Sequence, residues 1–362
     1  MAFEKFKKGL GIGGWLTNYK RFNVLPEEQR LIITVGDREH FESYITESDV
    51  AYISSLGMDH IRLGFDQIVL EEEPYVYSEK IFSILDSFVS WCEKYSLGIV
   101  FNLHKAIGNY CDIKEDVSLL EDEELQNRFI ALWETIEKRY SDKSDIAFEL
   151  LNEVRDISPE PWNALAEKTI SAIRRLNRER VIIIGSTHWS NPNTLNTLKV
   201  FDDEFVVYTF HCYAPFEFTH QQGVLQSGPL FYNRKMEYPS DDIERYRDYK
   251  RLHGCPKPPY TNLKRMDREF LEGHLLPAIK FKETHPDKVL WCGEFGTIRH
   301  IPIKFRENWM RDVISILNEN GIPYSVWNYL STPNDGNRFS LVDDDSREIL
   351  SNEMARIIRG EI

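Results

Sequence analysis

The sequence has few cysteines and no closely spaced pair of them. The 362 residues include only five cysteines, which is an odd number. They are widely scattered, at Cys92, Cys111, Cys212, Cys255 and Cys292. A disulfide framework or a structural zinc site needs cysteines at short, regular spacings, so neither is predicted. Reduced thiols in a cytoplasmic protein are the simplest interpretation.

Long apolar runs are missing as well. A membrane-spanning helix needs about 18 or more consecutive apolar residues, and the sequence has no such stretch. The N-terminal residues Met1–Lys8 carry charges but lead into no apolar run of signal-peptide length. We therefore expect no membrane partner, and either a cytoplasmic protein or a secreted one whose signal peptide has been removed.

Positive charge is in short supply. Lys and Arg number 44 against 58 Asp and Glu, which gives a net charge of −14. Nucleic acids and anionic membranes are bound through basic surfaces, so this balance argues against both as partners. Aromatic residues are plentiful, with 8 Trp, 17 Tyr and 21 Phe. They are enough for a large core and for a cleft that binds a neutral ligand.

Short β-rich runs alternate with longer amphipathic runs along the whole chain, which is the pattern of parallel βα units. Eight strands are expected, at Leu10–Gly13, His60–Phe65, Gly98–His104, Ile146–Glu153, Val181–Ser186, Phe205–His211, Val289–Glu294 and Tyr324–Asn328. The expected helices between them include Glu79–Tyr95, Asp122–Tyr140, Pro161–Asn177 and Arg306–Asn320. Eight repeats favour an α/β fold of the (β/α)8 TIM-barrel type over a doubly wound sheet. Such barrels build their active sites at the C-terminal ends of the strands.

One interval is too long for a single loop and helix. It follows the sixth strand, and it contains helix-like segments at Asp241–Arg251 and Asn262–Glu283. We interpret residues 217–275, approximately, as a helical subdomain inserted between the sixth strand and the sixth helix, over the active-site cleft. No internal repeat or linker divides the chain, so residues 1–362 are expected to form one catalytic domain.

Two of the expected strands run into a glutamate. Residues 146–153 end in Glu153 and residues 289–294 end in Glu294, each after a mostly apolar run. A core strand gains nothing from a charge at its end, because burying an unpaired carboxylate is costly. At one rim of a barrel, the two glutamates would supply a carboxylate pair for acid/base or covalent chemistry on a glycosidic bond. The plainer alternative is that both face solvent.

Other strand ends carry polar or aromatic side chains that suit such a site. Arg62 lies among apolar neighbours and needs a carboxylate partner, for which Glu294 is the candidate. The remaining candidates for contacts with a sugar are His104, Asn152, His211, Tyr213 and the flat indole of Trp327. A metal site is the competing use of the histidines, but neither an HxxxH nor an HExxH spacing is present, so we expect no metal and no cofactor.

The run Gly9–Gly14 fits the GxGxxG string of dinucleotide-binding sites. That fingerprint needs a strand before it and a helix that opens at its end. Here charged residues precede the run, and Trp15-Leu16-Thr17-Asn18 follows it. We therefore prefer a role for these glycines in the close packing of the first strand and its loop.

Five short motifs follow one another along the chain. They are His60-Ile61-Arg62-Leu63, Leu151-Asn152-Glu153, His211-Cys212-Tyr213, Cys292-Gly293-Glu294-Phe295-Gly296 and Val326-Trp327-Asn328. In this order the motifs resemble glycoside hydrolase family 5, the cellulase family of clan A. The chain departs from many relatives directly after His104, where Lys105-Ala106-Ile107-Gly108 stands in place of a second histidine and Ala-Pro-Gly.

The resemblance implies a retaining β-glycosidase, with Glu153 as the acid/base and Glu294 as the nucleophile. It also places the other candidate side chains around the sugar at the cleavage point, namely Arg62, His104, Asn152, His211, Tyr213 and Trp327. The expected activity is that of an endo-β-1,4-glucanase which cleaves soluble β-glucan of the cellulose, mixed-linkage or glucomannan type, as a monomer.

Two other functions stay open at this stage. One is an exo-acting β-glucosidase or oligosaccharide hydrolase, and the other is a carbohydrate-binding pseudoenzyme. Further aromatic residues that could stack on sugars, or simply pack the loops beneath them, are Trp15, Tyr110, Trp189, Phe216 and Phe218.

Overall fold

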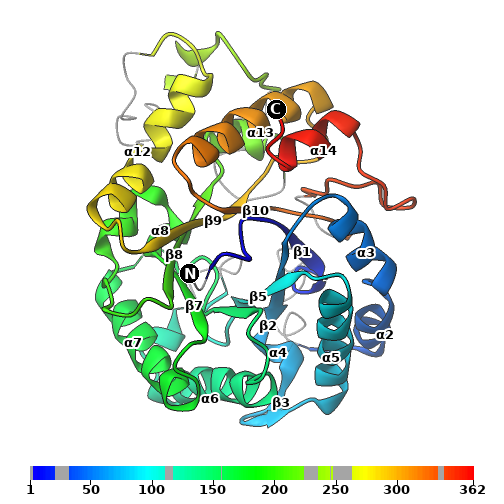
Figure 1. Cartoon of the computed structure of the whole chain (residues 1–362), viewed down its shortest axis with the longest axis vertical. Coiled ribbons are helices and arrows are strands. Elements are labelled where there is room, and N and C mark those ends of the chain that lie inside the picture. The colour runs from blue at the N-terminus through cyan, green and yellow to red at the C-terminus, as the bar shows by residue number, and fades with distance from the viewer. Residues whose placement is uncertain are drawn as a thin grey trace.

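The computed structural model describes residues 3–20, 32–110, 117–155, 157–223, 235–244, 246–247, 263–332 and 338–362. Eight parallel strands form a closed barrel in the order β1-β10-β9-β8-β7-β6-β5-β2, and β2 pairs back to β1 (Figure 1). The strands are β1 (Lys8–Leu16), β2 (His60–Asp66), β5 (Gly98–Lys105), β6 (Ile146–Glu149), β7 (Val181–Gly185), β8 (Val206–Cys212), β9 (Val289–Phe295) and β10 (Tyr324–Val326). All eight expected strands and the TIM-barrel fold are confirmed.

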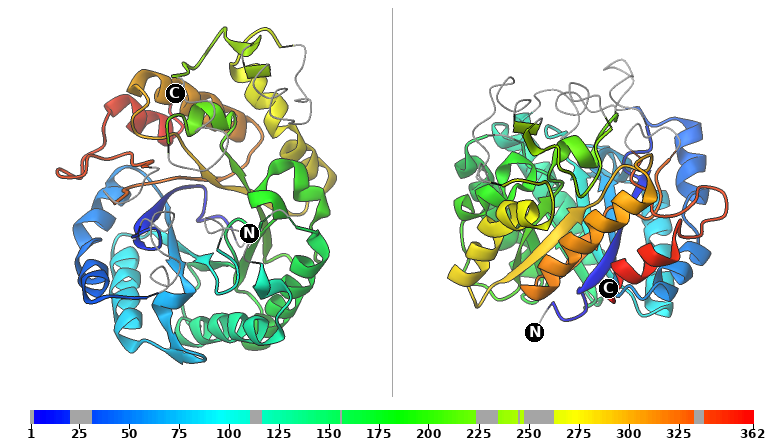
Figure 2. Two further views of the ribbon diagram at one scale, coloured as in Figure 1. Left: turned by 180° about the vertical axis from the view of Figure 1, so that it is seen from behind. Right: turned by 90° about the horizontal axis from the view of Figure 1, so that it is seen from above.

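Helices surround the barrel, and both chain ends lie at the same end of it, the N-terminus near the barrel axis and the C-terminus beside α13 and α14 (Figures 1 and 2). The long helices are α5 (Glu79–Lys94), α6 (Glu123–Arg139), α7 (Pro159–Leu176), α12 (Arg268–Thr284) and α13 (Ile303–Glu319). The shorter elements are α2 (Val35–Ser43), α3 (Glu47–Ser55), α4 (Gln67–Leu70), α8 (Thr187–Ser190), α9 (Phe216–Thr219), α14 (Asn352–Ile358), the 3-10 turns η1 (Ser118–Leu120) and η2 (Pro192–Thr197), and the hairpin β3 (Glu71–Glu73)–β4 (Val76–Tyr77). No helix in the described part of the chain combines the length and the hydropathy that a membrane crossing requires.

The sequence explains these helices locally. In α5, apolar residues recur every three or four positions from Ile81 to Cys92 and are buried against the barrel. The start of α6 is fixed by Asp122, whose side chain accepts hydrogen bonds from the backbone N–H groups of Glu124 and Leu125. Burial of the apolar face therefore determines where α5 lies, and the side-chain cap determines where α6 begins.

The barrel interior is mainly apolar at the end near the N-terminus. Inward-facing Val100, Ala147, Val207 and Trp291 form a separate core cluster there with Phe3 and Phe6, and these two phenylalanines stack at 4.8 Å. Toward the opposite ends of the strands the buried interior carries polar side chains instead, such as Arg62, Asn102 and Glu149. A filled apolar base under a polar rim is the arrangement from which barrel active sites are built.

The glycine-rich run belongs to β1. This strand continues without a break from Lys8 to Leu16, so the run opens no helix and the nucleotide interpretation is wrong. A Cβ atom on Gly11 would lie 2.6 Å from Cε3 of Trp327, and one on Gly13 would lie 2.7 Å from Cζ2 of the same ring. The two glycines therefore make room for Trp327.

Several expected boundaries are wrong. β6 ends at Glu149, so Glu153 lies four residues beyond the strand, and β10 ends at Val326. The helix expected to start at Asn262 begins at Arg268, because the Asp267 side chain caps the N–H of Glu269. The inserted subdomain stays a prediction, since residues 224–234 and 248–262 lie outside the described residues, and so does the end of the helix expected at 241–251.

Candidate active site

A β-bulge at the end of β9 turns Glu294 toward the barrel axis. Phe210 of β8 is aligned with Cys292, but His211 is aligned with Glu294, so Gly293 is an extra residue on β9. Such a bulge re-aims the side chain that follows it. A Cβ atom on Gly293 would come within 2.6 Å of the Thr209 Oγ1 atom, so the bulge requires glycine here. Glu294 becomes inward-facing, and its side chain is only 5% exposed.

Glu153 reaches the same place by a different route. The chain leaves β6 after Glu149, and Glu153 adopts a left-handed backbone conformation with φ of 42°. A non-glycine residue in this region carries strain, which concentrates at functional sites. The segment is anchored by a hydrogen bond from the Asn152 N–H to the Leu103 carbonyl, at 2.9 Å. The Glu153 side chain is 21% exposed and is therefore open to a ligand.

The two carboxylates and His211 form one cluster. The Nδ1 atom of His211 lies 2.9 Å from Oε1 of Glu153 and 3.7 Å from Oε2 of Glu294. Ligating atoms of all three residues lie within 4.8 Å of one another. In retaining glycosidases the two carboxyl groups are about 5–5.5 Å apart, whereas inverting enzymes need roughly 6.5–9.5 Å. The separation found here fits a retaining pair.

Arg62 is the buried cation of the site. Its Nη1 atom donates to Oε1 of Glu294 at 2.5 Å, which matches the expected pairing. It also donates from Nε and Nη2 to the two carboxylate oxygens of Glu149, at 2.6 and 2.8 Å, and from Nη2 to Oδ1 of Asn152 at 2.8 Å. Glu149 was missed in the sequence. Its role could have been suspected from the sequence, because Glu149 is a glutamate inside an otherwise apolar strand and Arg62 is a cation inside another.

The environment of Glu294 keeps it ionised. Burial raises the pKa of this carboxyl, but the charges of His211 and Arg62 outweigh burial and bring the pKa to about 2. The Tyr213 hydroxyl donates to Oε2 of Glu294 at 2.8 Å. Burial, together with the charge of Glu294, raises the pKa of Tyr213 well above its usual value, so the phenol retains the proton that it donates. Its surroundings therefore hold Glu294 in the anionic form.

Glu153 is shifted in the opposite direction. Burial raises its pKa above the ordinary value, and the charge of Glu294 adds to this, although the hydrogen bond with His211 opposes it. His211 itself is held toward its charged form, because Glu294 and Glu153 raise its pKa despite its burial. Two neighbouring carboxyls whose pKa values are pushed apart are suited to different roles, one as an anion and one as an acid.

His104 and Trp327 form a flat wall beside this cluster. Their rings stack with centroids 5.3 Å apart and planes 12° from parallel, and the guanidinium of Arg62 lies 5.9 Å from the indole centroid. Burial lowers the pKa of His104 well below its usual value, so the imidazole is neutral. Its Nδ1 atom is hydrogen bonded with Oδ1 of Asn102 at 2.9 Å. All eight site residues expected from the sequence thus lie at one end of the barrel and are linked by hydrogen bonds, ion pairs and ring stacking.

The other aromatic candidates differ in where they lie. Trp15 is buried, and its indole N–H donates to the Phe41 carbonyl at 2.7 Å, so it is a core residue. Phe218 and Tyr110 are buried as well, and Phe216 stacks on His220 at 3.9 Å. Trp189 is 40% exposed, and its backbone N–H donates to the carbonyl of Val154, directly after Glu153. Stacking of a sugar on Trp189 stays a prediction.

Lys105, in the segment that departs from many family members, is buried beside the site. Its ammonium donates to Oδ1 of Asn18 at 2.8 Å, and the Asn18 amide nitrogen lies 3.5 Å from Nε2 of His104. No pattern in the sequence indicated this contact, because Asn18 follows β1 and Lys105 ends β5.

Glu153, His211 and Glu294 also have the spacing of a His/carboxylate metal site. Both oxygens of Glu294, however, already accept hydrogen bonds, one from Arg62 and one from Tyr213. A guanidinium within 2.5 Å of a ligand oxygen repels a metal cation. The donor set fits a carboxylate pair better than a metal centre.

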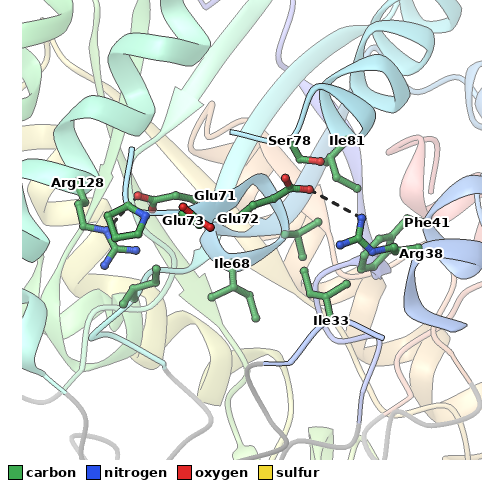
Figure 3. Close-up of a pocket in the computed structure, with 13 residues that line it drawn as sticks. Ile33, Arg38, Phe41, Ile68, Glu71, Glu72, Glu73, Ser78, Ile81 and Arg128 are labelled. Carbon is green, nitrogen blue, oxygen red and sulfur yellow. Dashed lines mark hydrogen bonds and ion pairs between the residues drawn. The ribbon is translucent and has the colours of Figure 1, made fainter. Parts of the chain in front are cut away.

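A separate pocket of about 400 Å³ lies on the flank of the barrel (Figure 3). Its apolar floor includes Phe41 and Ile68. Each of its two arginines is paired with a glutamate of the same pocket: Arg128 with Glu71 at 3.0 Å and Arg38 with Glu72 at 3.8 Å. Glu153, Glu294 and the other six site residues do not line it, so it is distinct from the carboxylate cluster.

Comparison with known proteins gives a consistent result. The family model described as cellulase, glycosyl hydrolase family 5, matches residues 34–332. Endoglucanase C of Acetivibrio thermocellus is 36% identical over 98% of both chains. Cellodextrinase A of Ruminococcus flavefaciens is 30% identical, over 87% of this chain and 83% of that protein.

Solved structures of similar fold include a hyperthermophilic endo-β-1,4-glucanase in complex with substrate, with a TM-score of 0.72 at 19% identity and coverage of 99% and 98% of the two chains. Another is Thermotoga maritima Cel5A in complex with cellobiose, with a TM-score of 0.71 at 22% identity and coverage of 99% and 100%. At these identities the likeness shows a shared fold.

Proposed function

The chain belongs to the cellulase family, glycosyl hydrolase family 5, and is an O-glycosyl hydrolase of the endo-β-1,4-glucanase type; on this premise we propose that Glu294 is its nucleophile and Glu153 its acid/base. The proposed substrate is a soluble β-glucan of the cellulose, mixed-linkage or glucomannan type. The proposal is carried by the separation of the two carboxylates, whose ligating atoms lie within 4.8 Å of one another.

In the first step, an oxygen of Glu294 attacks the anomeric carbon while protonated Glu153 gives its proton to the departing glycosidic oxygen. The bond to the leaving sugar breaks as the glycosyl ester forms on Glu294. Arg62 and Tyr213 hold Glu294 ionised and oriented before the attack. Preorganised donors of this kind cost no rearrangement when the charge moves.

In the second step, Glu153, now a carboxylate, takes a proton from water. The water attacks the anomeric carbon and releases Glu294, so the sugar leaves with its original anomeric configuration. Asn152 is placed to bind the 2-hydroxyl of the sugar, a contact that strengthens in the transition state. His104 and Trp327 provide a neutral flat wall for the ring, and His211 holds Glu153 toward the cluster.

The test is a product time course on soluble barley β-glucan and on cellotetraose, with the anomeric configuration of the first product read by NMR. We expect a rapid fall in viscosity, a spread of oligosaccharides and initial β-anomers. Initial α-anomers would contradict the retaining pair. Binding of β-glucan without cleavage would favour the pseudoenzyme.

A second candidate function has its own support. The match to a relative named cellodextrinase keeps an oligosaccharide hydrolase open. In that case cellotetraose should be consumed much faster, per bond, than β-glucan. Glucose or a single short product should appear from the start, with little loss of viscosity.

The pH dependence of kcat/KM follows from the two shifted carboxyls. The nucleophile must be ionised, and because the pKa of Glu294 is about 2, activity should persist well below pH 4.5 for as long as the protein stays folded. The acid must be protonated, so activity on cellotetraose should fall as the pH rises through the raised pKa of Glu153. We call this fall in kcat/KM at high pH the alkaline limb. A dinitrophenyl cellobioside, whose leaving group needs no proton, should show a much weaker alkaline limb. Equal alkaline limbs for both substrates would contradict the assignment of Glu153.

A further inference from the structure

We propose that Glu149 is a positioning residue for the glycosidase reaction, acting through Arg62 on the nucleophile Glu294. The inference rests on the proposed function and extends it to a third carboxylate. Glu149 is the last residue of β6, aligned with Asn102 of β5, and is 1% exposed. It is therefore enclosed in the barrel, four residues before the acid/base.

Glu149 holds one edge of the guanidinium. Its Oε2 accepts from Nε of Arg62 at 2.6 Å and its Oε1 accepts from Nη2 at 2.8 Å. Two parallel hydrogen bonds between planar groups fix both the plane and the rotation of the arginine fork. Nη1 then points away from Glu149, and this is the atom that donates to Glu294 at 2.5 Å. The direction from which Glu294 is held is thus set by Glu149.

The same contact orients the amide of Asn152. Nη2 of Arg62 also donates to Oδ1 of Asn152 at 2.8 Å. With its oxygen facing Arg62, the amide directs its nitrogen the other way, where it lies 3.5 Å from Nε2 of His104. One buried carboxylate therefore controls, through one cation, both the nucleophile and the side chain proposed to bind the sugar 2-hydroxyl.

Glu149 also adds a negative charge to the cluster. Arg62 carries one positive charge against the two carboxylates Glu149 and Glu294. The pKa of Glu153 responds to His211, Glu294 and Arg62, and that of Glu294 to His211, Arg62, His104 and Tyr213. Glu149→Gln replaces none of these groups, but it takes from Arg62 one of its two carboxylate partners. The loss of its charge should make proton loss from Glu153 easier, since like charges favour the protonated form.

The chain offers a matched control in a second buried pair. Arg180 donates from Nε and Nη2 to Glu137 at 2.6 and 3.3 Å, and both side chains are buried. Arg180 also donates to the carbonyls of Lys143 and Ile146, at the start of β6, which is the opposite end of the strand from Glu149. Glu137→Gln therefore breaks a similar pair away from the site.

The experiment measures kcat/KM against pH, with cellotetraose and with dinitrophenyl cellobioside, and the unfolding midpoint of each variant. For Glu149→Gln we expect kcat/KM to fall about 10²-fold or more on both substrates, since attack by Glu294 is impaired in both. The alkaline limb with cellotetraose should move to lower pH by about 0.5–1 unit. Glu149→Asp keeps the charge but shortens the reach, so it should lower kcat/KM and leave the alkaline limb in place. Glu137→Gln should lower the unfolding midpoint only.

Three results would overturn the proposal. One is a Glu149→Gln variant with wild-type kcat/KM and alkaline limb, and another is an equal shift of that limb in Glu137→Gln. If Glu149→Gln does not fold, Glu149→Asp is the deciding variant. The third contradicting result would then be a Glu149→Asp variant with wild-type kcat/KM or with a displaced alkaline limb. If the wild type cleaves no β-glucan, the proposed function fails separately. A ¹³C NMR titration of the Glu153 carboxyl in the wild type and in Glu149→Asp and Glu149→Gln still tests the charge coupling, and an unchanged pKa in Glu149→Gln would reject it.

Discussion

Replacement of Glu294 by glutamine should lower kcat on the order of 10⁵-fold on both cellotetraose and dinitrophenyl cellobioside, as expected for the loss of a nucleophile. Glutamine keeps the shape of the side chain, but its amide cannot form the glycosyl ester. Glu153 cannot take over the attack, because its raised pKa favours the acid form and it lies on the leaving-group side of the bond in the proposed mechanism. Initial rates with the activated substrate measure the loss directly.

Covalent trapping provides the control. A 2-deoxy-2-fluoro cellobioside with a good leaving group should add one glycosyl unit to the wild type, on the peptide that contains Glu294, and none to Glu294→Gln. The variant leaves Arg62 with one carboxylate partner fewer, so rates must be compared well below its unfolding midpoint. A label on any other residue, or substantial turnover by the variant, would show that Glu294 is not the nucleophile.

Replacement of Glu153 by glutamine should have an effect that depends on the leaving group. On cellotetraose and β-glucan, kcat/KM should fall by about 10²–10⁴-fold, the usual contribution of general acid/base assistance. With dinitrophenyl cellobioside the first step needs no acid and should stay fast. The second step still lacks its base, so a burst of dinitrophenolate followed by slow turnover is expected, and stopped-flow absorbance measures it.

Added azide distinguishes the two carboxylates. Azide is a nucleophile that needs no base, so it should speed turnover of the activated substrate by Glu153→Gln and yield a β-glycosyl azide. It should have no such effect on the wild type or on Glu294→Gln. Equal losses on natural and activated substrates, with neither burst nor azide rescue, would reject Glu153 as the acid/base.

The regular parts of the fold could be predicted from the sequence because they rest on local physics. The strands that contain Leu63, Phe101 and Val207 are short apolar runs, and the helices between them have apolar faces with a period near 3.6 residues. Most of the eight site residues were found because they stand near the point where an apolar strand ends, and Arg62 because it is a cation inside an apolar strand. The C-terminal ends of the strands of a closed parallel barrel meet at one rim, so side chains at the ends of different strands are expected to lie close together.

Glu149, the bulge at Gly293 and the left-handed turn at Glu153 could not be predicted in the same way. Along a regular strand, side chains alternate between the two faces, so an unbroken β9 with Trp291 inward would point Glu294 outward. That Glu149 pairs with Arg62 beside the expected partner Glu294 was equally hidden, since a sequence gives no distances between strands. Glu149 and Glu294 both contact this guanidinium, 87 and 232 residues away along the chain.

The sequence by itself determined the barrel, the family and the chemical identity of the site, because hydrophobic periodicity and strand-end residues are local properties. Only the tertiary structure decided the direction of each carboxylate, the partners of Arg62 and the opposite pKa shifts of Glu153 and Glu294. Those depend on burial and on charges a few ångströms away in space, contributed by strands distant in the chain, and electrostatic interactions in a buried site vary steeply with such distances.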